Sequence, residues 1–298
     1  MNNLISFFRK KYPEFVPLAL TEIPEHIISL KIEGKQHEFT FFNMLYEPQL
    51  IGVVIPNKWN NYGFEDVTKM TISNEKKIQQ IHFDVIFERT ILADEVKIAV
   101  FSVQEAKLKN GMLKKWYVNR FYNRAIAKNN FIIKTFDAKV YQKLIAFFYY
   151  PKPVFIVSTQ ANLGKNAFPV DTCKQIGNHF IFGVRRSNAI ISTINPGDVI
   201  AIGLSDFSKR DLIYQLGKYI PEQNLIQFTR NEKYNIAVPE IVVENHFVSI
   251  TEIIRYDNQN VYVGKIIASE AILKSTLFFA HIHKFWLLSS ERTKLYYG

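Results

Sequence analysis

The chain has 298 residues and a formal net charge of +10, with 37 Lys and Arg against 27 Asp and Glu. Apolar residues make up 48% and charged residues 21%, a globular composition that excludes an intrinsically disordered chain. The single cysteine, Cys173, excludes an internal disulfide framework and a multi-cysteine zinc site. One cysteine also favours a reducing compartment, so we expect a cytoplasmic protein.

No segment has the roughly 20 apolar residues that a membrane-spanning helix needs. The apolar stretch near the start, residues 4–8, is short and is followed, not preceded, by the basic cluster 9–11. This order is not that of a signal peptide. We therefore expect no contact with a membrane.

Residues 1–136 are interpreted as an N-terminal domain of mixed, strand-leaning character. Runs rich in β-forming residues occupy 26–32, 50–55, 81–87 and 95–103. His26, His37 and His82 are scattered among them, and we interpret each as structural rather than as a ligand. The role of this domain stays open between an appended partner-binding domain and a diverged second barrel.

One strongly basic stretch runs from Lys107 to Lys134 and contains no acidic residue. Trp116, Tyr117 and Phe121 are interleaved with its cations. Aromatic side chains between cations can stack on nucleic-acid bases, but they can also point into a core beneath a solvated surface. Because no named nucleic-acid motif accompanies the charges, we favour the solvated surface and keep nucleic-acid binding as an alternative.

Residues 137–298 are interpreted as a second domain that opens on a helix. Asp137 can cap a helix that runs through Phe148. Its apolar face would consist of Val140, Leu144, Ile145 and Phe148. Pro151 and Pro153 end it, and a buried strand is expected over 154–159.

The rest of this domain is dominated by strands. An extended segment is expected over 166–173, and a strand over 179–185 with Phe180, Phe182 and Val184 on one face. A strand over 199–204, a helix over 209–216 and a long hairpin, 242–254 with 261–268, follow. The fold class is therefore mainly β (α+β), with short inserted helices in a small closed or partly closed barrel.

A candidate anion site lies where the strand ending at Arg185 meets a short helix. Ser187 is a plausible N-cap of that helix, and Ile190, Ile191 and Ile194 would form its apolar face. A helix N-terminus favours an anion, and arginine matches phosphate oxygens in a bidentate fork. Alone, Arg185-Arg186-Ser187-Asn188 is a weak signal, and the solvated start of a helix is the favoured interpretation.

The order of these segments resembles the flavin reductase-like, FMN-binding split-barrel family over about residues 147–298. The stretch 150–159, with Pro151-Lys152-Pro153, resembles the family's opening Pro-Arg-Pro strand, and 166–172 resembles the loop that the family places against the flavin. Arg185-Arg186-Ser187 is similar to the family's Arg-x-Thr phosphate motif, and 208–211, 238–240 and 261–266 resemble later segments. Cys173-Lys174 departs from the family's usual Ser-Trp/Phe.

The resemblance implies a split β-barrel and a flavin-binding oxidoreductase. It implies FMN as cofactor, NAD(P)H as electron donor, hydride transfer to flavin or a downstream acceptor, and a homodimer. The implied cofactor-binding residues are Asn166, Ala167, Phe168, Thr172, Cys173, Arg185, Arg186, Ser187 and Asn188. No catalytic side chain is expected, because the flavin carries the chemistry.

Two alternatives stay open at this point. One is a relative of the same fold that binds a ligand or dimerises without catalysis, and the other is the nucleic-acid binder described above.

His281-Ile282-His283 would place two imidazoles on one face of a strand. With no acidic or cysteine ligand nearby in sequence, we expect no metal site there. Cys173 is interpreted as a packed small residue rather than a redox thiol.

Overall fold

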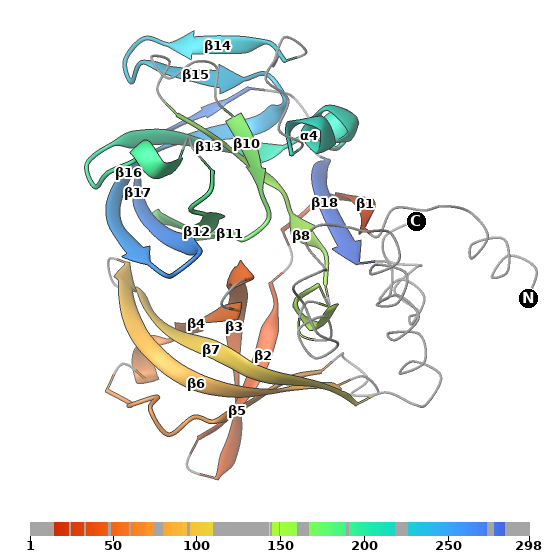
Figure 1. Cartoon of the computed structure of the whole chain (residues 1–298), viewed down its shortest axis with the longest axis vertical. Coiled ribbons are helices and arrows are strands. Elements are labelled where there is room, and N and C mark those ends of the chain that lie inside the picture. Colours follow the sequence, from red (N-terminus) through yellow and green to blue (C-terminus); the bar gives the residue numbers. More distant parts are fainter. Residues whose placement is uncertain are drawn as a thin grey trace, which may run out of the picture.

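The computed structural model describes the chain from residue 15 to residue 283, with gaps. The described residues are 15–23, 25–32, 34–46, 49–59, 61–73, 80–93, 96–109, 143, 145–148, 150–159, 167–188, 191–217, 226–272 and 277–283. Strands dominate them, and three groups of strands account for most of the described residues (Figure 1). The predicted mainly β class, with short inserted helices, is confirmed.

The N-terminal strands close into a six-stranded antiparallel barrel in the order β2-β3-β4-β7-β6-β5. These strands are β2 (Ile27–Ile32), β3 (Lys35–Tyr46), β4 (Gln49–Ile55), β5 (Lys69–Ser73), β6 (Gln80–Ala93) and β7 (Val96–Lys109). Alternation along β2 turns Ile28, Leu30 and Ile32 inward. The strands predicted for this half thus form a closed barrel. The one-turn helix η1 (Asn57–Trp59) is the only helical element among the described residues before residue 143.

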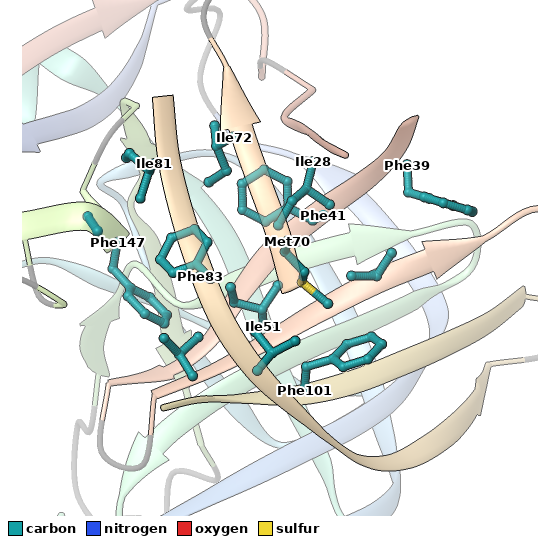
Figure 2. Close-up of a cluster of buried hydrophobic side chains, with 14 of the residues drawn as sticks. Ile28, Phe39, Phe41, Ile51, Met70, Ile72, Ile81, Phe83, Phe101 and Phe147 are labelled. Carbon is teal, nitrogen blue, oxygen red and sulfur yellow. The ribbon is translucent and has the colours of Figure 1, made fainter. Parts of the chain in front are cut away.

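The barrel interior is a packed aromatic core. Figure 2 shows Phe41, Phe83 and Phe101 in one cluster of buried side chains between the strands. Each is exposed by 1% or less. Phe147, from the helical residues 145–147, extends this core and lies 6.2 Å from the ring of Phe83. The predicted helix before Pro151 is therefore present in its described residues, and its N-terminal part, Asp137 to Val140, lies outside them.

The C-terminal strands form a seven-stranded antiparallel sheet in the order β10-β9-β13-β16-β17-β12-β11. They are β9 (Phe155–Ser158), β10 (Ala167–Val170), β11 (Cys173–Ile176), β12 (His179–Arg185), β13 (Val199–Ser205), β16 (Val242–Arg255) and β17 (Gln259–Ala271). Phe168 of one edge strand and Cys173 of the other belong to the same buried cluster. The sheet therefore curls into a half-barrel, as a partly closed barrel predicts.

The half-barrel packs its outer face against the N-terminal barrel. Along β12, Phe180 and Phe182 point into the half-barrel, as predicted, while Ile181 joins Met44 and Leu45 of β3 in a second cluster. Contact is closest at Gly183, where a Cβ atom would lie 2.0 Å from the carbonyl oxygen of Met44. Only glycine allows the two backbones to approach this closely.

A small sheet joins the two ends of the described chain. β1 (Phe15–Leu20) pairs with β18 (Phe278–His283), which pairs in turn with β8 (Lys152–Pro153). Figure 1 shows β1 and β18 side by side, next to β8. Residues of the predicted N-terminal domain thus pair with the end of the second one, and the boundary at 136/137 stays a prediction.

The remaining elements lie over the half-barrel. They are η3 (Ile191–Thr193), η4 (Phe207–Lys209), α4 (Arg210–Leu216), β14 (Phe228–Asn231) and β15 (Ile236–Pro239). α4 ends at Gly217, as the sequence predicts. Among the described residues, no helix has the length and apolar content to cross a membrane.

The helix predicted to start at Ser187 is wrong. Arg186 and Ser187 form a turn instead, and the amide of Arg186 donates a hydrogen bond to the carbonyl oxygen of Asn258. Among the described residues between Ser187 and Pro196, the only helical element is the three-residue η3. Pro196 and Gly197, whose φ is +95°, then turn the chain, and these residues cannot continue a helix.

Candidate functional site

A cavity of about 310 Å³ lies where the barrel, the half-barrel and the small sheet meet. Phe42 and Asn43 of β3 line one side, and Lys152 and Pro153 of β8 line another. The segment before β2 and the start of β11 complete its wall. The cavity is at the lower end of the size range of small-molecule sites, about 300–1,000 Å³.

Lys152 is the buried cation of this cavity, with 3% of its surface exposed. Its Nζ lies 3.3 Å from the hydroxyl oxygen of Tyr46, to which it donates. It also lies 4.7 Å from the ring centroid of Phe148 and 4.9 Å from that of Tyr46. Burial lowers the pKa of Lys152 to about 7, against the opposing effect of the negative charge of Asp171.

Asp171 connects Lys152 to a histidine on the small sheet. Nε2 of His281 lies 2.8 Å from Oδ2 of Asp171. Burial acts to raise the pKa of Asp171, but the hydrogen bond and charge of His281, the charge of Lys152 and a hydrogen bond from Tyr46 together lower it. Burial and the charge of Asp171 raise the pKa of Tyr46 well above its usual value. At neutral pH, Asp171 is therefore ionised and Tyr46 is protonated.

An aromatic pair forms another part of the cavity wall. The rings of His26 and Tyr150 stack with their centroids 3.4 Å apart and their planes 19° from parallel. Burial raises the pKa of Tyr150 well above its usual value, so this phenol is neutral. Phe42 and Phe155 also line the cavity. The wall therefore offers flat apolar surfaces beside the charged groups, and His26 is part of it.

A second lysine lines the same cavity. Burial lowers the pKa of Lys174, and the negative charge of Glu25 opposes this effect. Asn43, across the cavity, donates from Nδ2 to the carbonyl oxygen of Phe147 at 2.7 Å. Its amide is thus held in place by the helical residues before β8.

Of the predicted cofactor-binding residues, the structure brings Cys173 to this cavity. Burial raises the pKa of its thiol well above its usual value, in agreement with a packed rather than a reactive cysteine. Thr172 is buried beside it, and its hydroxyl donates to the carbonyl oxygen of Gly183 at 2.8 Å. Ala167 and Phe168 are buried in core clusters. Asn166 lies outside the described residues.

The predicted phosphate residues do not line the cavity. Arg185, Arg186 and Ser187 are exposed, and Asn188 is half-buried. Nη1 of Arg186 donates to the carbonyl oxygen of Asp257, in the turn between β16 and β17, at 3.3 Å. Because the expected helix is not present at Ser187, no helix dipole favours an anion there. A role of Arg185 and Arg186 in binding phosphate stays a prediction.

Sequence reasoning missed the charged residues that meet at the cavity. Lys152 had a signal, because it stands between two prolines at the start of the segment that resembles the family. His281 lies on a strand, β18, as the interpretation of His281-Ile282-His283 supposes. Its partner Asp171 follows β10 and is distant from it in the sequence. Tyr46 carried no signal. Among the described residues, no group of three or more His, Cys, Asp or Glu could hold a metal ion.

The alternative basic stretch is described only in its first residues. Lys107 pairs with Asp84 at 2.8 Å and with Glu105 at 3.0 Å. Its remaining part, residues 110–134, lies outside the described residues, so nucleic-acid binding stays a prediction.

Comparison with known proteins gives structural likeness only. No family model matches the sequence, and no curated protein matches it. Solved structures that are similar in part include a Sinorhizobium meliloti protein proposed to be an oxidoreductase, with a TM-score of 0.42, 14% identity and 47% of this chain covered. This chain spans 50% of the length of that protein.

Two further similar structures are of flavin-related proteins. A flavin reductase domain protein from Arthrobacter sp. FB24 has a TM-score of 0.40 and 12% identity, over 45% of this chain and 86% of that one. An FMN-binding protein from Thermus thermophilus has a TM-score of 0.41 and 13% identity, over 47% and 86%. Both belong to the class that the sequence resembles.

Proposed function

We propose that this chain is a flavin-binding oxidoreductase and that the flavin ring binds in the cavity beside Lys152. One observation carries the proposal. Cys173, one of the implied cofactor-binding residues, lines this cavity, and so does Pro153, from the segment that resembles the family's opening strand. Two residues that are 20 positions apart in the sequence thus line the same cavity.

The residues of the cavity fit a flat aromatic ligand. The stacked rings of His26 and Tyr150 offer an apolar wall, and two lysines, Lys152 and Lys174, line the cavity together with the carboxylates of Asp171 and Glu25. The volume of about 310 Å³ suits a ring system more than a whole dinucleotide. The FMN phosphate would then lie at the cavity mouth, within reach of a lysine.

The chain's part in the reaction is to bind and to orient. A bound flavin accepts hydride at its ring and passes the electrons on. The aromatic wall excludes water from one side of the cavity, and Lys152, with a pKa of about 7, can hold or release a proton there. FMN as the particular flavin, and NAD(P)H as its reductant, are parts of this proposal.

A flavin titration of the purified chain tests the proposal. We expect FMN fluorescence to be quenched on binding and NAD(P)H to be oxidised when free flavin is supplied. Lys152→Met should weaken FMN binding about 10- to 100-fold, the scale of one charge-assisted hydrogen bond. Lys58→Met, at an exposed position of η1, is the matched control and should change nothing.

The outcomes separate the alternatives. Arg185→Ala tests the sequence-based phosphate site: if it weakens FMN but not riboflavin, while Lys152→Met has no effect, the flavin binds at the end of β12 and not in the cavity. Binding without NAD(P)H oxidation would leave a flavin carrier instead of an enzyme. No binding of FMN or riboflavin would reject the flavin function.

We also propose a homodimer, as the sequence resemblance implies. The outer apolar face of the half-barrel is covered by the chain's own barrel through the cluster of Met44, Ile181 and Val263. A dimer must therefore use another surface. Ile86 and Leu92, on β6, are 55% and 72% exposed. Sedimentation at micromolar concentration checks this, and a purely monomeric chain would reject it.

A further inference from the structure

Lys152 combines three features that an ordinary surface lysine does not have together. The residue lines a cavity of small-molecule size, its burial is nearly complete, and its amine donates a hydrogen bond to a hydroxyl group. The hydroxyl of Tyr46 lies 3.3 Å from Nζ and leads on, through Asp171, to the partly exposed His281. We propose that Lys152 is a nucleophilic amine that condenses with small aldehydes or ketones in this cavity to form an imine.

The surroundings of Nζ favour the neutral amine, which is the nucleophile. The rings of Phe148, Tyr46 and Phe147 lie 4.7, 4.9 and 5.9 Å from it, and they replace water around the amine. Burial opposes the charged form. The pKa of about 7 agrees with this geometry. About half of Lys152 is then neutral at pH 7, against roughly one in 2,500 for an exposed lysine.

The condensation balances without an oxidant or a reductant. The lone pair of Nζ attacks the carbonyl carbon, the carbonyl oxygen takes up a proton, and Nζ loses one, which gives a carbinolamine. Loss of the hydroxyl group as water then leaves a C=N bond between the carbonyl carbon and Nζ. One carbonyl compound and one amine thus give one imine and one water.

Proton transfer in these steps has a route built from the chain. Tyr46 is protonated and hydrogen-bonded to Asp171, and Asp171 accepts from His281. The His281 side chain is 15% exposed, so the end of this route reaches solvent. Tyr46 is accordingly a positioning and relay residue. Phe42, Phe155 and Tyr150 give the cavity apolar walls, which suit an uncharged carbonyl compound.

Reductive trapping on the full-length chain tests the proposal. The chain is incubated at pH 7 with propanal and sodium cyanoborohydride, and peptide mapping by mass spectrometry follows the alkylation of each lysine with time. We expect Lys152 to be alkylated at least tenfold faster than the exposed Lys58. Lys174 lines the same cavity and is the internal control for access; it should react more slowly than Lys152.

Two variants make the result specific. Lys152→Met should abolish the fast-labelled site and leave the other lysines unchanged. Tyr46→Phe should slow labelling of Lys152 alone. If Lys152→Met fails to fold, the ratio of the labelling rates of Lys152 and Lys58 in the wild-type chain still tests the proposal. Labelling of Lys152 no faster than Lys58, or faster labelling of Lys174, would overturn the proposal. Neither result depends on flavin binding, so this proposal and the proposed function can fail separately.

Discussion

Oδ2 of Asp171 lies 2.8 Å from Nε2 of His281, although 110 positions separate the two residues in the sequence. Asp171 follows β10 on the half-barrel, and His281 lies on β18 of the small sheet. The pair therefore joins two groups of strands beside the cavity. Because Asp171 also acts on Lys152 and accepts from Tyr46, it is the centre of the charged network.

Asp171→Asn should destabilise the fold by about 1–3 kcal/mol, the usual effect of losing one partner of a partly buried charged hydrogen bond. Urea unfolding at pH 7 measures this. His281→Gln is the second variant, and a double-mutant cycle should give a coupling of about 1 kcal/mol or more. Strictly additive effects of the two substitutions would show that the pair contributes nothing.

The pH dependence of stability should reveal Lys152. Its pKa is about 7 in the folded chain and about 10.4 in an unfolded one. Between these values the unfolded chain binds more protons, so the free energy of unfolding rises with pH, and below pH 7 the contribution is flat. From pH 7 to pH 9 the contribution of Lys152 should rise by roughly 2 kcal/mol.

Lys152→Met isolates this contribution from the other groups around the cavity, which include Tyr46, Tyr150, Asp171 and Cys173. The difference in unfolding free energy between the wild-type chain and the variant should change with pH as stated. An equal pH dependence in both chains would mean that Lys152 titrates as an ordinary exposed lysine.

Gly183→Ala should loosen the contact between the barrel and the half-barrel. Its Cβ would meet the carbonyl oxygen of Met44 at 2.0 Å and Cδ2 of Leu45 at 2.3 Å, so we expect a loss of about 2–4 kcal/mol. Gly197→Ala is the control. Its φ is +95° and nothing lies within 4 Å, so only backbone strain of about 1–2 kcal/mol is expected. Thermal unfolding compares them, and a smaller loss for Gly183→Ala would contradict the packing.

The strands of this fold were accessible from the sequence because their side chains alternate. The strand His179–Arg185 was predicted with its inward face, and the structure has β12 over the same residues. The helix predicted from Ser187 was wrong, because the apolar spacing over 190–194 suits one helical turn as well as several. The turn at Pro196-Gly197 decides between them.

The candidate site was less accessible, because its members are distant in sequence. Tyr46, Lys152, Asp171 and His281 come from four separate segments, and no spacing rule joins them. Only the antiparallel pairing of β18 with β8 brings Lys152 opposite His281. Closure of the N-terminal strands into a barrel was equally hidden, because it depends on pairing between β2 and β5.

A crystal structure of the chain grown with FMN would show where the flavin binds. We expect density for the flavin ring in the cavity, between Lys152 and the stacked rings of His26 and Tyr150, with Cys173 at its edge. Flavin density at Arg185–Asn188 with an empty cavity, or no flavin density at saturating FMN, would contradict this expectation.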